Sequence, residues 1–182
     1  METDLRALAA AVSELQAQVQ VLTDKDAIAD VLYRYTVALD TRNWVALDDV
    51  FTPEATMVVA AAESSERISI NDEVSEGRSA VIAMISGILN GMDATQHVCA
   101  QPLIELNGDE ATSTSYLHEQ HYFVGEGGPE TLETGGIYID KFTRTAAGWR
   151  ITERVLQNLY WNGDVSLIDR AMERARVKAS AS

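Results

Sequence analysis

Hydrophobic positions near the start of the chain repeat at alternating spacings of three and four residues, the heptad pattern of a coiled coil. The repeating residues are Leu5, Leu8, Val12, Leu15, Val19 and Leu22. Valine at a positions with leucine at d favours two strands, although a short seam can also form a trimer or pack on its own domain. We therefore predict an N-terminal heptad helix over residues 1–23 that assembles the protein into a homodimer or homotrimer.

The segments that follow carry the 3.6-residue periodicity of amphipathic helices. Polar residues at Thr23–Asp26 predict a break with a helix cap. Three helices are then expected, over residues 24–39, 44–51 and 77–92. Between the last two, the β-rich residues 55–61 predict a strand, with a hairpin partner at residues 66–70.

From residue 94 onwards the pattern changes to the alternation of strands. Four long strands are separated by the turn sequences NGDE, GEGGPE and AAG, so we expect them to be joined by hairpins. The tail from Asp164 to Lys178 predicts a helix with Asp164 as its N-cap. Helices followed by an antiparallel meander indicate an α+β protein. The predicted units are residues 1–23, 24–163 and 164–182.

The overall charge limits the classes of partner. The chain of 182 residues is 46% hydrophobic and has a formal net charge of -14. It lacks the basic surface of a nucleic-acid binder or of a protein that binds anionic membranes. A single cysteine, Cys99, permits no internal disulfide. With no apolar run approaching 18 residues, we expect a cytoplasmic protein. The expected partner is a small hydrophobic molecule.

No phosphate loop, dinucleotide fingerprint, nucleophile elbow or zinc pattern occurs in the sequence. The segment HEQH at residues 118–121 resembles a zincin motif only superficially. Its histidines are three apart on a predicted strand, so they point to opposite faces, whereas Glu119 and His121 share a face. We expect neither a metal nor a cofactor.

Five ionisable residues lie within otherwise apolar segments: Tyr35, Asp40, His97, Glu119 and His121. A carboxylate beside a histidine holds the tautomer of the ring and makes a base for proton abstraction. Asp40 and His97 are far apart in the sequence, so the residues alone cannot pair them. The alternative remains that His97 is a buried structural histidine and Asp40 an exposed aspartate at a helix end. Tyr35 and Asp40, five residues apart, point about 140° from each other on a regular helix.

Residues 24–161 resemble the SnoaL-like branch of the NTF2-like superfamily. The resemblance rests on the segments DAIADVLYRYTVALDTRNWVALDDVFTPEATMVV, EGRSAVIAMI, ATQHVCAQPLIELNGDEAT and YIDKFTRTAAGWRITER. It implies a cone in which helices pack on a strongly curved antiparallel sheet around an apolar pocket. The fold hosts many activities, so it decides little about function.

Within this superfamily the chain resembles the bile acid 7α-dehydratases most, in the spacing of Tyr35 and Asp40 and in His97 five residues before Pro102. Scytalone dehydratases and hexachlorocyclohexane dehydrochlorinases are similar in the aspartate–histidine pair. The resemblance implies a His97–Asp40 base, with Tyr35 and Glu119 as catalytic hydrogen-bond and proton donors. The residues expected to bind the substrate are Trp44, His121, Asn158 and Trp161.

We thus expect a cofactor-independent lyase that performs a dehydratase-type β-elimination on a small hydrophobic, ring-containing substrate, steroid-like or aromatic. The alternatives are a retro-aldol lyase that releases formaldehyde from an aromatic diol, a polyketide-type cyclase or isomerase, and a non-catalytic ligand-binding module. The binding module predicts that His97 and Asp40 point away from each other.

Overall fold

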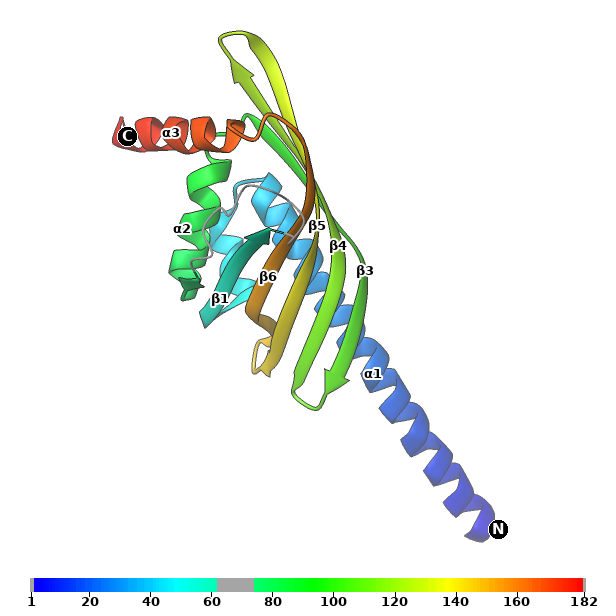
Figure 1. Ribbon diagram of the computed structural model, residues 1–182. Coiled ribbons are helices and arrows are strands. Elements are labelled where there is room, and N and C mark those ends of the chain that lie inside the picture. Colours follow the sequence, from blue (N-terminus) through cyan, green and yellow to red (C-terminus); the bar gives the residue numbers. More distant parts are fainter. Residues whose placement is uncertain (1, 62–73, 182) are drawn as a thin grey trace.

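A long helix, a six-stranded sheet and two shorter α-helices make up the computed structural model, which describes residues 2–61 and 74–181 (Figure 1). In chain order the elements are α1 (Glu2–Asp40), the 3-10 helix η1 (Trp44–Asp49), β1 (Phe51–Ala61), β2 (Ser75–Glu76), α2 (Arg78–Leu89), β3 (Ala94–Asn107), β4 (Glu110–Gly125), β5 (Gly128–Thr145), β6 (Gly148–Gly163) and α3 (Leu167–Ser180).

Helix α1 runs unbroken from Glu2 to Asp40, so the predicted break at Thr23–Asp26 is wrong. Thr23 caps no helix there, and Asp24 beside it binds the sheet. Its carboxylate accepts two hydrogen bonds from the guanidinium of Arg144, at 2.6 and 2.7 Å, and one from the indole of Trp149 at 3.1 Å. Asp24 therefore fastens the middle of α1 to the hairpin between β5 and β6.

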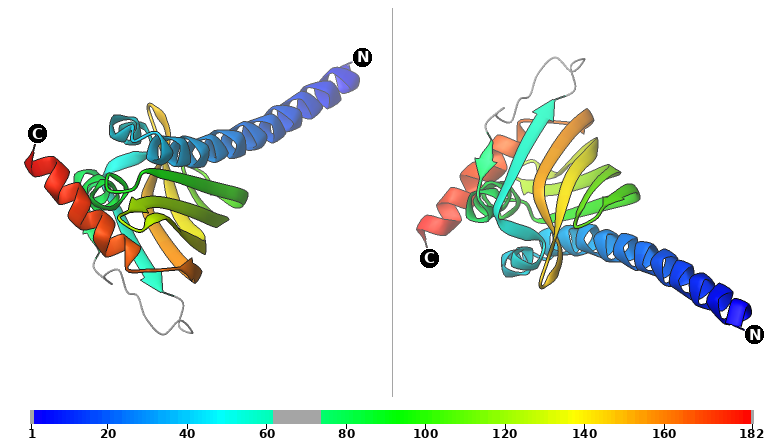
Figure 2. Two further views of the ribbon diagram at one scale, coloured as in Figure 1. Left: turned by 90° about the horizontal axis from the view of Figure 1, so that it is seen from above. Right: turned by 90° about the horizontal axis from the view of Figure 1, so that it is seen from below.

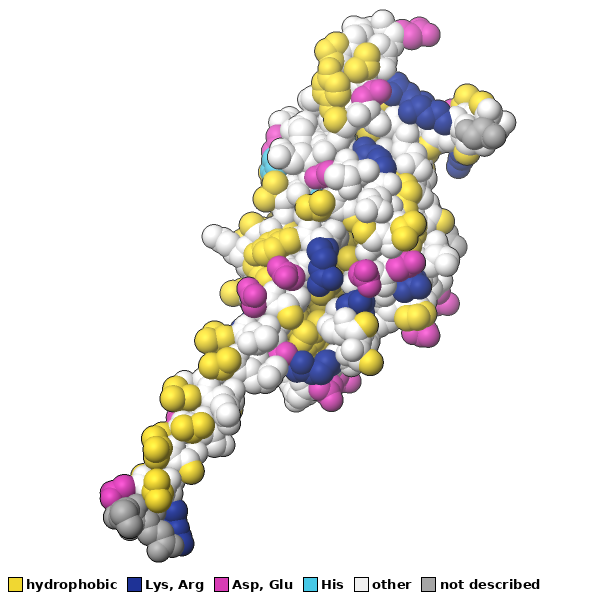
Figure 3. Space-filling model, turned by 180° about the vertical axis from the view of Figure 1, so that it is seen from behind, with side chains coloured by type: hydrophobic (Ala, Val, Ile, Leu, Met, Phe, Trp, Pro, Cys, Tyr) yellow, Lys and Arg dark blue, Asp and Glu magenta, His cyan; other side chains and the backbone are white. Residues whose placement is uncertain are grey.

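The N-terminal part of α1 extends away from the rest of the chain (Figures 1 and 2). Every residue from 3 to 23 is exposed, and burial begins at Asp24. The six heptad side chains are 45–67% exposed, and hydrophobic side chains follow this projecting segment (Figure 3). The seam thus has no partner within the described part of the chain, and assembly through it stays a prediction.

The four predicted hairpin strands are confirmed as β3 to β6, each antiparallel to the next. The sheet as a whole is mixed, because β1 lies parallel to β6 in the order β2-β1-β6-β5-β4-β3. No hairpin joins β1 to β6, so nothing forces them to be antiparallel. The sheet is also open at β2 and β3 rather than strongly curled, which corrects the expected curved antiparallel sheet.

The remaining elements follow the predicted boundaries with small changes. The strand expected at 55–61 begins earlier, at Phe51, and pairs with the short β2. Its expected hairpin partner at 66–70 lies outside the described residues. The helix expected at 44–51 is a 3-10 helix, and the one at 77–92 is α2.

Helix α3 begins at Leu167, not at the predicted cap Asp164. Asp164 Oδ1 instead accepts the backbone N–H of Ser166 at 3.0 Å, which forms a turn before the helix. Helix α3 packs closely on the end of α2, where a Cβ on Gly91 would meet the carbonyl oxygen of Ala171 at 1.8 Å. None of the helices in residues 2–61 and 74–181 has the length and apolarity to cross a membrane.

Candidate active site

A cavity of about 70 Å³ lies between the C-terminal half of α1, helix α2 and one face of the sheet. Its walls are mainly apolar and include Leu39, Met57, Val59 and Ile85. Its polar residues are Tyr35, His97, Glu119, His121, Thr134, Tyr138 and Asn158. Aliphatic walls with a few converging polar groups are typical of a small-molecule site.

The register of the sheet explains why these polar side chains meet. His97 on β3 pairs with Glu119 on β4, Glu119 pairs with Thr134 on β5, and Thr134 pairs with Trp161 on β6. Directly paired residues project from the same face of a sheet, so the four side chains form one row across four strands. His121 is two residues beyond Glu119 and joins it on that face.

His118 confirms the expected alternation of the HEQH segment. It lies on the opposite, exposed face and contacts Glu133 Oε1 through Nε2 at 3.1 Å. The segment is therefore no zincin motif.

Asp40 and His97 are in direct contact. Asp40 Oδ1 lies 2.6 Å from His97 Nδ1, and Asp40 Oδ2 accepts the backbone N–H of His97 at 2.9 Å. Partial burial raises the pKa of Asp40, but the hydrogen bonds from His97 and Thr95 outweigh it, and the pKa stays below its usual value. An ionised carboxylate only accepts, so Nδ1 of His97 carries the hydrogen and, in the neutral ring, Nε2 offers its lone pair to the cavity.

The C-terminal end of α1 carries the anion of Asp40, which the helix macrodipole disfavours, and the local structure compensates for it. Arg42 adopts a positive φ of 56°, and the N–H of Asn43 reaches back to the carbonyl of Ala38 at 2.9 Å, as in a Schellman motif. Nη1 of Arg42 donates to the carbonyl of Leu39 at 2.6 Å and to Thr95 Oγ1 at 2.7 Å. Thr95 in turn donates to Asp40 Oδ1 at 2.9 Å. Sequence reasoning missed both Arg42 and Thr95.

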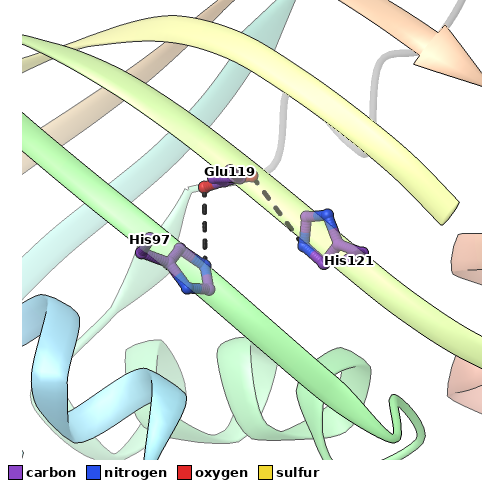
Figure 4. A group of neighbouring side chains, drawn as sticks. All are labelled: His97, Glu119 and His121. Atoms are coloured by element: carbon purple, nitrogen blue, oxygen red, sulfur yellow. Dashed lines mark ion pairs between the residues drawn. The ribbon is translucent and has the colours of Figure 1, made fainter.

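Glu119 lies between the two histidines (Figure 4). Its Oε1 is 3.7 Å from His97 Nε2, and its Oε2 is 3.9 Å from His121 Nε2. Nδ1 of His121 lies 3.3 Å from the carbonyl oxygen of Leu132. Burial lowers the pKa of His121, so its ring is neutral, with the hydrogen on Nδ1 and the lone pair on Nε2. These three residues are also the group that could hold a metal ion.

Two tyrosines form the floor of the cavity. The hydroxyl of Tyr138 donates to Glu119 Oε1 at 3.4 Å, and the rings of Tyr35 and Tyr138 pack edge to face at 5.8 Å. Burial raises the pKa of both phenols, so both remain neutral hydrogen-bond donors. Tyr35 is 1% exposed and thus belongs both to the core and to the cavity wall.

Below the tyrosines, Arg154 is completely buried. Its guanidinium lies 4.1 Å from the ring centroid of Tyr35 and 4.0 Å from that of Tyr138, and it binds both carboxylate oxygens of Asp140 at 2.7 and 2.9 Å. Sequence reasoning missed Tyr138, Asp140 and Arg154. Counting back from the turn at AAG would pair Asp140 with Glu153. The register shift between Lys141 and Phe142 pairs it with Arg154 instead, so the sequence carries no direct signal for this pair.

The remaining predicted residues divide into two groups. Asn158 and Trp161 line the cavity, whereas Trp44 packs against the main core and is not among the lining residues. Asp40 does not line the cavity either, because α1 stays regular up to its last residue, and Asp40 reaches the site through His97. Asn158 is 2% exposed, and its Oδ1 has no hydrogen-bond partner.

Comparison with known proteins assigns the chain to a family. Residues 20–155 match the SnoaL-like domain. The chain belongs to the SnoaL-like family. A protein from Penicillium crustosum, named terrestric acid biosynthesis cluster protein E, is 30% identical over 149 residues, which cover 79% of this chain and 88% of that protein.

Solved structures similar to this SnoaL-like protein include two that are named as a dehydratase and a dehydrochlorinase. A candidate scytalone dehydratase from Novosphingobium aromaticivorans superposes with a TM-score of 0.67 at 20% identity, covering 81% of this chain and 91% of that one. Hexachlorocyclohexane dehydrochlorinase LinA-type3 from Novosphingobium barchaimii gives 0.67 at 14% identity, covering 81% and 94%. An NTF2-like protein from Novosphingobium aromaticivorans gives a TM-score of 0.60 at 20% identity, covering 86% and 94%, and at such identities the likeness establishes the NTF2-like fold.

Proposed function

We propose that this SnoaL-like protein is a lyase that removes water from a small, hydrophobic, ring-bearing substrate by β-elimination. The observation that carries the proposal is the contact of 2.6 Å between Asp40 Oδ1 and His97 Nδ1 at the edge of an apolar cavity. A non-catalytic binding module would have no need for this pair. It predicts that His97 and Asp40 point away from each other, whereas the two side chains are in contact.

His97 is the proposed general base. With Nδ1 held by Asp40, Nε2 takes a proton from a carbon next to a carbonyl or another unsaturated group. The electrons of the broken C–H bond form the new double bond, and the imidazolium that results is stabilised by the Asp40 carboxylate.

Glu119 and the tyrosines are the proposed partners on the leaving side. As the C–O bond breaks, the leaving oxygen takes a proton from Glu119, which completes the loss of water. While the C–H bond breaks, Tyr35 or Tyr138, both neutral donors, stabilises the negative charge that develops on the activating oxygen. The buried cation of Arg154 against both rings adds positive potential on that side of the cavity.

The size of the cavity limits the substrate. At about 70 Å³ it is well below the roughly 300–1,000 Å³ of typical ligand pockets. A groove of about 680 Å³ adjoins it and shares the walls Met57, Val59, Met84 and Ile88. We infer that the reacting carbon enters the cavity and that the rest of an aromatic or steroid-like substrate occupies the groove.

The proposal is tested by incubating the protein with a panel of hydroxylated cyclic ketones, aromatic and steroidal, and recording mass spectra. A product 18 mass units lighter, formed by the wild-type chain and not by His97→Ala, supports a dehydratase. Release of formaldehyde would contradict dehydration and indicate a retro-aldol lyase. Conversion of the substrate without loss of mass would contradict it and indicate an isomerase.

A further inference from the structure

We propose that His97, Glu119 and His121 form a binding site for one divalent transition-metal ion. This inference goes beyond the proposed elimination and does not depend on it. The candidate ligand atoms of the three side chains all lie within 4.8 Å of one another, and the residues are 4–7% exposed.

The ring nitrogens that face away from the cluster are held by acceptors. Nδ1 of His97 is bound to the carboxylate of Asp40, and Nδ1 of His121 faces the carbonyl of Leu132. Metal-binding histidines nearly always donate their second N–H to a carboxylate or a backbone carbonyl, because this fixes the tautomer that offers the other nitrogen to the ion. Both histidines meet this condition.

The inner atoms of the three side chains are spaced somewhat more widely than around a bound ion. The separations of 3.7 and 3.9 Å between Glu119 and the two Nε2 atoms are too long for hydrogen bonds. Ligand atoms bound to one zinc ion at about 2.1 Å with tetrahedral angles lie about 3.4 Å apart. The candidate ligand atoms, all within 4.8 Å of one another, would therefore need inward movements of less than about 1 Å to reach bonding distance.

The electron pairs that face the centre of the cluster favour a cation there. The lone pair of His121 Nε2 faces a carboxyl group, as does that of His97 Nε2 when its ring is neutral, in a cavity with mainly apolar walls. A cation between the three groups would satisfy all of them at once. Asn158, whose buried Oδ1 has no partner, lines the same cavity and offers a further oxygen atom.

The donor set indicates the class of ion. Two imidazoles and one carboxylate suit zinc or iron(II) and leave coordination positions open. Calcium and magnesium prefer oxygen ligands and are disfavoured. An ion held here would occupy the Nε2 lone pair of His97, so it would compete with the proton of the substrate and inhibit the proposed elimination.

The test is a calorimetric titration of the full chain, first dialysed against a chelator, with Zn²⁺, and a parallel titration with Co²⁺ followed by its visible absorption. We expect one ion per chain with a Kd below about 1 µM and a higher Tm on saturation. Glu119→Gln and His121→Ala should each weaken binding by more than about 100-fold, since outer-shell partners alone are worth about 10–100-fold.

His118→Ala is the matched control, because His118 lies on the same strand but on its opposite face. It should bind the ion like the wild type. The proposal is overturned if the wild type binds no ion below about 10 µM, or if His118→Ala weakens binding as much as the isosteric Glu119→Gln. The titration contains no substrate, so its failure and the failure of the proposed elimination are separate results.

Discussion

Asp40 binds His97 twice, through the backbone N–H at 2.9 Å and through Nδ1 at 2.6 Å. The pair joins the last residue of α1 to β3, and it explains how a carboxylate is accommodated at the negative end of a helix dipole. Thr95 and Arg42 complete the arrangement, since Arg42 donates to Thr95, and Thr95 donates to Asp40.

Thr95→Val should reduce kcat by about 10- to 100-fold, because a hydrogen bond to a charged group contributes about 1.5–3 kcal/mol. The substitution removes the hydroxyl that orients Asp40 while keeping the shape of the side chain. KM should change little, since Thr95 is not a lining residue of the cavity. Thr112→Val, on the exposed side of β4, is the control, and equal kcat values for the two variants would contradict the positioning role.

Asp140→Ala should lower the free energy of unfolding by about 3–5 kcal/mol, because it leaves the buried guanidinium of Arg154 without its carboxylate. The neighbouring pair of Lys141 and Glu153 joins the same two strands but is exposed. Lys141→Ala should therefore cost at most about 1 kcal/mol. Urea denaturation measures both, and a similar loss for the two variants would refute the structural importance of the buried pair.

Asp24 should contribute to stability in a pH-dependent way. The hydrogen bonds from Arg144, opposed by burial and aided by Trp149, hold the pKa of Asp24 well below its usual value. A depressed carboxyl pKa stabilises the fold above the unfolded pKa of about 4 and loses this effect as the pH falls further.

Asp24→Asn should thus be less stable than the wild type at pH 7, and the difference should shrink below about pH 4. Chemical denaturation at a series of pH values measures it. Asp109→Asn, which changes the exposed second partner of Arg144, is the control and should show a much smaller difference. A difference for Asp24→Asn that stays constant down to about pH 2 would exclude the linkage.

The exposed heptad seam predicts an assembly of two or three chains through α1. The double variant Leu8→Gln and Leu15→Gln should dissociate it into monomers in sedimentation velocity, with little change in the folded domain, because both side chains are exposed in the single chain. Val21→Gln, which alters another exposed side chain of α1 outside the seam, should leave the assembly intact. A wild-type monomer at micromolar concentrations would rule out this role of the seam.

Much of the fold follows from the sequence because its strands are long, alternating and joined by clear turns. The break at Thr23–Asp26 was wrong because a capping residue and a residue that binds the sheet look alike in sequence; only the distant Arg144 and Trp149 distinguish them. The parallel pairing of β1 with β6 was missed for a similar reason, since it depends on no local turn.

The site was partly predictable. Alternation along β4 placed Glu119 and His121 on one face, but their approach to His97 depends on the register between β3 and β4, which the bulge between Ala100 and Leu103 shifts. The family resemblance predicts that Trp44 binds the substrate. Trp44 lies beyond the end of α1, however, and there it packs against the main core.

The most direct test of the account is the turnover of His97→Gln compared with the wild type and His118→Ala on any substrate that the protein dehydrates. Because the general base is removed while the shape of the cavity is largely retained, His97→Gln should lose about 10²–10⁴-fold in kcat, whereas His118→Ala should keep wild-type turnover. A His97→Gln variant that dehydrates the substrate at a rate near that of the wild type would contradict the central claim.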